Sequence, residues 1–123
     1  MFSHVMVGSN DIERSKRFYD ALFAQEAFKD DKGRLFYRKD GSVFMVSKPI
    51  DGQPACPANG GTVGFKFDSP EDVDAWQRVG AESGGTPAED PPGFRQLQTG
   101  RFYVAYMRDP DGNKLCALHR PLE

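Results

Sequence analysis

The chain has 123 residues, the size of one domain, and its 38% hydrophobic and 28% charged residues are typical of a folded globular protein. The formal net charge is −2 with the signs interspersed, so we expect no nucleic-acid partner and no membrane partner. Acidic residues follow the N-terminus too early for a secretory signal. The two cysteines, Cys56 and Cys116, form no Cys-x-x-Cys motif, which favours a reduced, cytoplasmic setting.

The first part of the chain, about residues 1–50, is predicted to form a strand, a helix and three further strands. A Val- and Met-rich strand at 3–8 precedes a helix at 11–24, which Asn10 is expected to cap. Three short strands follow the helix, around 27–29, 34–39 and 42–48. Prolines and glycines then predict a loop at 49–61.

The same order of elements is predicted again over about residues 60–123. A strand at 62–68 leads into a helix that Ser69 caps and that ends at Gly84-Gly85, with Trp76 in its buried stripe. Four strand segments follow: 86–89, an interrupted run after Phe94, 102–108 and 113–119. The last two form a hairpin, because Asp109-Pro110-Asp111-Gly112 is a strong turn sequence.

An internal duplication is the plain explanation of this repeated pattern, since each half by itself would bury only one face of a small sheet. The sequence therefore predicts an α+β fold. Two βαβββ modules, about 1–50 and 60–123, would form a curved mixed sheet with the helices on its outside, all within one domain.

Two segments give the chain a family resemblance. His4 opens the first strand and is followed by Asn10-Asp11-Ile12 and Phe18-Tyr19, and the last hairpin reads Arg108-Asp-Pro-Asp-Gly-Asn-Lys-Leu115. With the βαβββ unit used twice, this resembles the vicinal oxygen chelate superfamily, which includes glyoxalase I, bleomycin-resistance proteins, fosfomycin-resistance enzymes and extradiol dioxygenases. The chain looks like the small bacterial glyoxalase-like proteins of this superfamily. The resemblance implies an open barrel, a small-molecule ligand, and a homodimer that completes the pocket.

The resemblance also implies where a metal would bind. Metal-dependent members carry ligands in strands one, four, five and eight, usually His, Glu, His and Glu, and the matching positions here are His4, Met45, Thr62 and Cys116. Only His4 is the expected residue, and thioether and hydroxyl groups are poor ligands for a hard cation. We therefore expect no metal and no other cofactor, although a soft metal held by His4 and Cys116 remains an alternative.

The same positions are candidates for binding or catalysis without a metal. His4 could act as a general base or be an ordinary strand residue. Cys116 could be a nucleophile or a buried core thiol. Lys66 shares its strand face with Thr62 and could bind an anion. Of Tyr103 and Tyr106, alternation along the strand allows only one to face the cleft, and Tyr103 is the candidate.

Three functions remain open on this basis. The first is a glyoxalase-like protein that binds a small molecule without the usual metal centre, either as a lyase or isomerase or without chemistry. In that reading His4 is the catalytic candidate, and the substrate-binding candidates are Met45, Thr62, Lys66, Tyr103 and Cys116. The second is a metal-dependent lyase of the lactoylglutathione lyase type. The third is an antibiotic-sequestering protein of the bleomycin-resistance type.

Overall fold

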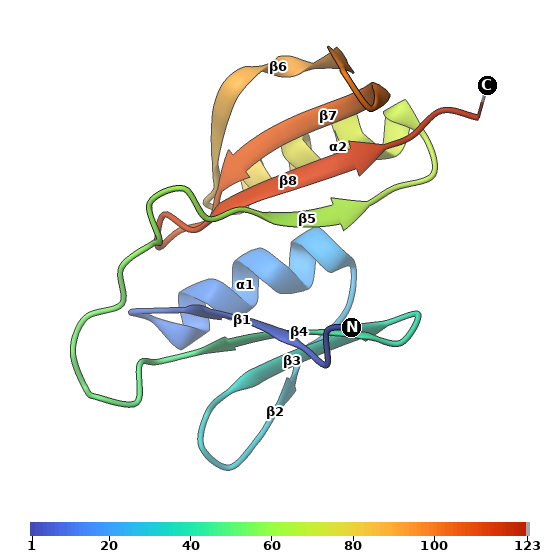
Figure 1. Cartoon of the computed structure of the whole chain (residues 1–123). Coiled ribbons are helices and arrows are strands. Elements are labelled where there is room, and N and C mark those ends of the chain that lie inside the picture. Colours follow the sequence, from blue (N-terminus) through green and yellow to red (C-terminus); the bar gives the residue numbers. More distant parts are fainter. Residues whose placement is uncertain (123) are drawn as a thin grey trace.

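A computed structural model of the protein describes residues 1–122 and contains two four-stranded sheets and two helices (Figure 1). The elements of the first module are β1 (Val5–Gly8), α1 (Ile12–Phe23), β2 (Phe28–Lys29), β3 (Leu35–Lys39) and β4 (Ser42–Ser47). The strand order is β1-β4-β3-β2, with β1 parallel to β4 and the other neighbours antiparallel.

The second module repeats this topology. Its elements are β5 (Val63–Lys66), α2 (Pro70–Glu82), β6 (Thr86–Leu97), β7 (Gly100–Arg108) and β8 (Lys114–His119). The strand order is β5-β8-β7-β6, and β5 is parallel to β8. The predicted α+β class and the two βαβββ modules are therefore confirmed, and the two sheets stay open.

One strand differs from the prediction. The sequence predicts separate segments at 86–89 and after Phe94, whereas β6 runs through both and changes register between Ala88 and Gly93. Pro91 and Pro92 lie in this bulge, where a missing backbone N–H removes no hydrogen bond from the ladder. The prolines therefore bend the strand without ending it.

The two modules share one hydrophobic core. Figure 1 shows α1 between the first sheet and the strands of the second. Phe18 and Tyr19 of α1 are fully buried in the same cluster as Trp76 of α2 and Leu115 of β8, which confirms that Trp76 is a core residue. Within residues 1–122, no helix is long and apolar enough to cross a membrane.

The start of α1 corrects the predicted cap. Asp11 is the N-cap, and its carboxylate accepts a 3.1 Å hydrogen bond from the Arg14 N–H. The Asn10 side chain instead donates a 3.1 Å hydrogen bond to the Ala55 carbonyl and accepts a 2.7 Å hydrogen bond from the Ala55 N–H. The prediction that Asn10 caps the helix was wrong because this side chain holds the loop at 49–61, a long-range role that local sequence does not reveal.

The β7–β8 turn docks against the same end of α1. Asp111 accepts hydrogen bonds from the Asn10 N–H at 2.9 Å and from the Arg14 guanidinium at 2.8 Å. The Ser15 hydroxyl lies 3.2 Å from its second carboxylate oxygen. Asn113 donates a 3.0 Å bond to the Gly8 carbonyl at the end of β1. The turn that joins β7 and β8 therefore also joins the two modules.

Candidate functional site

Each sheet has one face toward the shared core and a second face, called here its open face, on the other side. Along β1, β3, β4, β5, β7 and β8 alternate residues belong to the core cluster, so their neighbours lie on the open face. The core-facing residues of β1, β4, β5 and β8 are Val5, Val7, Phe44, Val46, Val63, Phe65, Leu115 and Ala117. The open faces consequently carry most of the residues that the sequence predicts to form a site.

An apolar row crosses the open face of the first sheet. Phe28, Phe36, Met45 and Met6 are consecutive partners in the register of β2, β3, β4 and β1. Met45, a predicted ligand-binding residue, is 8% exposed at the centre of this row, whereas Met6 is 54% and Phe28 61% exposed. The Arg38 guanidinium lies 5.5 Å from the centre of the Phe36 ring. This row offers a surface for an apolar or aromatic ligand group.

His4 directly precedes β1 and is exposed. Its Nδ1 lies 2.8 Å from the Ser3 hydroxyl. Since the side-chain partner of His4 within residues 1–122 is this exposed neighbour, the imidazole is accessible to a ligand.

Cys116 lies at the centre of the open face of the second sheet. Its register partners are Gly64 on β5 and Tyr106 on β7. The residue is 6% exposed, and burial raises the pKa of the Cys116 thiol, although the nearby Tyr106 hydroxyl acts in the opposite direction. Cys116 is therefore buried, and its thiol is protonated at neutral pH, which weakens it as a nucleophile.

The two tyrosines of β7 are divided between the faces of the sheet. Tyr103 lies on the core side and its hydroxyl donates a 2.7 Å hydrogen bond to Asp74 of α2, whereas Tyr106 lies beside Cys116. The alternation predicted that only one of the two tyrosines could face the cleft, and the structure places Tyr106, not the candidate Tyr103, on the open face with Cys116. The choice needed the direction of the β7 pleat, which the pairing of β7 with β8 decides.

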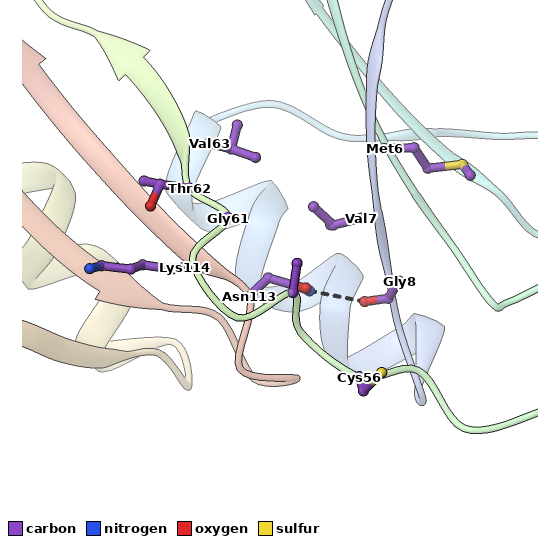
Figure 2. Close-up of a pocket in the computed structure, with 10 residues that line it drawn as sticks. Met6, Val7, Gly8, Cys56, Gly61, Thr62, Val63, Asn113 and Lys114 are labelled. Atoms are coloured by element: carbon purple, nitrogen blue, oxygen red, sulfur yellow. Dashed lines mark hydrogen bonds between the residues drawn. The ribbon is translucent and has the colours of Figure 1, made fainter.

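A cavity of about 340 Å³ lies between β1 and the segment that enters β5 (Figure 2). Met6, Val7, Cys56, Thr62 and Val63 contribute to its lining. Thr62 is the one predicted site residue that lines it, whereas Lys66, four residues further on, is exposed at the far end of β5. The cavity therefore opens at the seam between the modules, which sequence reasoning did not identify.

The residues at the four positions where the resemblance implies metal ligands do not fit a divalent metal. His4 and Cys116 supply an imidazole and a protonated thiol, while Met45 and Thr62 supply a thioether and a hydroxyl. Among residues 1–122, no three His, Cys, Asp or Glu side chains are grouped closely enough to hold a metal ion. A zinc site needs about three protein ligands and Ni or Mg sites favour carboxylates, so the chemistry of these four side chains does not suit such a metal.

Comparison with known proteins agrees with this architecture. A crystal structure of a glyoxalase/bleomycin resistance protein from Albidiferax ferrireducens T118 is 52% identical, with a TM-score of 0.94, and the match covers 98% of this chain and 99% of that one. No curated protein matches the chain significantly.

More distant structures share the fold alone. Lactoylglutathione lyase from Agrobacterium tumefaciens is 19% identical with a TM-score of 0.69, covering 97% of this chain and 92% of that one. The fosfomycin resistance protein FosX from Mesorhizobium loti is 18% identical with a TM-score of 0.72, and the match covers 99% of this chain and 93% of that one. The sequence model of a protein family, the Glyoxalase/Bleomycin resistance protein/Dioxygenase superfamily, matches residues 1–117. With a repeated βαβββ topology and a relative of 52% identity, the chain belongs to this superfamily.

Proposed function

We propose that the protein binds a small molecule on the open faces of its two sheets without the divalent metal usual in the family. The observation that carries this proposal is the residue set at the ligand positions, where Met45, Thr62 and Cys116 stand in place of hard-metal ligands while still lying on or beside these faces. A lyase or isomerase reaction of the glyoxalase type would use His4 as its base, since this imidazole is exposed and histidine is the most frequent general base in enzymes.

A second copy of the chain is part of this proposal. β1 and β5 are edge strands, so each leaves one row of backbone groups without a strand partner inside residues 1–122. Exposed Met6 lies on the open face of β1, and exposed Phe28 lies on the same face at the opposite edge of the first sheet, on β2. A homodimer that covers these residues would enclose the site, and we place the dimer in the cytoplasm, where Cys56 and Cys116 stay reduced.

The test measures ligand binding and turnover with and without metal. Protein dialysed against EDTA is screened with small carboxylates, aldehydes and aromatic compounds by thermal shift, and hemithioacetal turnover is assayed after adding Ni, Zn or Mn. We expect ligand stabilisation in EDTA and no metal that restores turnover. Stoichiometric metal that switches on hemithioacetal turnover would instead support the metal-dependent lyase. Light scattering of the same sample reports the dimer.

His4 has its own variant in this test. We expect His4→Ala to change ligand affinity or turnover more than stability, because the residue is exposed and precedes β1. Ser3→Ala is the matched control, since it removes only the hydroxyl beside the imidazole. A strongly destabilised His4→Ala protein with unchanged affinity per folded molecule would remove His4 from the site.

Binding without chemistry is a second candidate function, and the apolar row of the first sheet favours it. Phe28 and Phe36 present aromatic rings 5.9 Å apart on the open face, a surface suited to stacking against an aromatic drug. If the protein sequesters such a drug, a hydrophobic antibiotic should raise its unfolding temperature in the thermal-shift screen, and no compound in the screen should be turned over.

A further inference from the structure

The open face of the second sheet is basic, although the whole chain has a net charge of −2. Strand register and ring contacts place five basic side chains on it: Lys66, Arg95, Arg108, Lys114 and Arg120. Within residues 1–122, the one ion pair on this face joins Lys114 to Glu89, and Lys66 has no carboxylate partner. The face therefore has an excess of positive charge.

An apolar floor lies beneath these charges. Phe102, Val104 and Cys116 form a small buried cluster, separate from the main core, with Tyr106 and Leu118 packed against it. The Arg120 guanidinium and the Lys114 amino group each lie 4.9 Å from the centre of an aromatic ring, those of Phe102 and Tyr106. Apolar side chains with cations at their border suit a ligand that has an apolar body and an anionic group.

Glu89 reaches this face from a strained backbone position. Its φ of 59° lies in the left-handed region, which is unfavourable for glutamate, and it falls in the bulge of β6 between Ala88 and Gly93. The bulge turns the carboxylate toward Lys114 of β8, with which it forms an ion pair. About half of the Glu89 side chain is exposed, so the carboxylate can leave Lys114 for water without being buried elsewhere.

We propose that this face binds the carboxylate of a small molecule with an apolar body, and that Glu89 occupies Lys114 until the ligand replaces it. The proposal rests on the function proposed above and specifies its ligand class. Lys114, two residues along β8 from the Gly64–Cys116 pair, binds the anion, and Lys66, two residues along β5 on the other side of that pair, adds positive charge to the face. Burial raises the pKa of Tyr106, so its hydroxyl keeps a proton to donate.

The test compares three probes that share one ring system. The anion 1-naphthoate, the neutral 1-naphthamide and the cation 1-naphthylmethylammonium are titrated into the full chain and followed by the backbone amide signals of Gly64, Tyr106 and Cys116. The variants are Lys114→Ala, Lys66→Ala and Glu89→Gln. Lys32→Ala is the matched control, because Lys32 is exposed in the turn between β2 and β3. The amide spectrum of each variant also shows whether it folds.

We expect 1-naphthoate to shift these amides and to bind about tenfold more tightly than 1-naphthamide, the gain typical of a charge-assisted hydrogen bond. Lys114→Ala should weaken 1-naphthoate about tenfold, and Lys66→Ala should weaken it by a smaller factor, because Lys66 acts on the anion from further away. Glu89→Gln should tighten it, because the competing carboxylate is gone, and Lys32→Ala should leave it unchanged.

Three results would overturn the proposal. They are equal affinity for 1-naphthoate and 1-naphthamide, unchanged 1-naphthoate binding in both lysine variants, or weaker binding in Glu89→Gln. If 1-naphthamide shifts the same amides as tightly, the ligand class is wrong while small-molecule binding at this face stands. If no probe shifts them, the anion site is rejected, and the metal and turnover assays still decide the proposed function separately.

Discussion

The Tyr19 hydroxyl donates a 2.6 Å hydrogen bond to Asp109, 90 residues further along the chain. Both residues are buried, with 0% and 4% exposure. Asp109 also accepts bonds from the N–H groups of Asp111 and Asn113, at 2.9 and 2.8 Å, which close the β7–β8 turn. This single carboxylate therefore shapes the hairpin of the second module and holds it against the helix of the first.

Tyr19→Phe should lower the free energy of unfolding by about 1–3 kcal/mol, because it leaves a buried carboxylate oxygen with one donor fewer. Chemical denaturation measures the change. Tyr103→Phe is the matched control: it also removes a tyrosine–aspartate bond, but one near solvent, and should cost less. Equal losses in the two variants would show that burial of the Tyr19–Asp109 bond has no special role.

Asp111→Asn should destabilise the protein by about 1–2 kcal/mol, a value reduced from that of a fully buried pair because Arg14 is partly exposed. The Asp111 side chain is 1% exposed and the Arg14 side chain 42%, and Arg14 Nε is already buried without a partner. The control is Glu13→Gln, whose exposed pair with Lys29 should contribute nothing measurable to denaturation. An Asp111→Asn protein as stable as this control would show that the bonds of Asp111 to the start of α1 do not help to hold the two modules together.

Gly80→Ala should destabilise the protein by about 1–3 kcal/mol despite the better helix propensity of alanine. A Cβ at Gly80 would lie 2.2 Å from Met107 Cε and 2.3 Å from its Sδ, where α2 packs on β7. Gly64→Ala is the comparison, since a Cβ there meets nothing within 4 Å. Thermal unfolding of both variants tests this difference, and a stabilised Gly80→Ala would show that Met107 moves aside freely.

Cys56 and Cys116 should differ in their reaction with Ellman's reagent. Cys56 is exposed, whereas Cys116 is buried and its pKa is raised by burial, so less of it is the reactive thiolate. We expect one thiol per chain to react in native buffer at pH 7.5 and both to react in denaturant, with the slow thiol accelerating as pH rises. Cys56→Ser should remove the fast reaction, and a fast thiol remaining in that variant would contradict the buried position of Cys116.

Much of the fold was predictable because its signals are local. Alternating apolar residues in the strands, Ser69 before Pro70 at the start of α2, and the Asp109–Gly112 turn each depend on neighbours in the chain. The errors arose where distant groups compete for the same side chain or strand. Asn10 bonds Ala55 instead of capping α1, and β6 continues past two prolines because β7 pairs with both of its parts.

The site was predictable only in part. Alternation along the strands placed Cys116 on the face of β8 that points away from the core, and it put Tyr103 and Tyr106 on opposite faces of β7. It could not say which tyrosine shares a face with Cys116, because that depends on the β7–β8 register. Glu89 carried no signal in the sequence as a site residue. Its position comes from a positive φ in a bulge, a backbone state that a glutamate residue in a sequence does not indicate.

The sequence by itself determined the repeated βαβββ order and the family positions that lack metal-ligand residues, because both are properties of residue types at known spacings. Only the tertiary structure decided how the modules meet. The packing of α1 between the sheets, the buried bonds of Asp109 and Asp111, and the basic open face of the second sheet all join residues far apart in the chain. Such contacts depend on the packing of whole elements, which no local pattern contains.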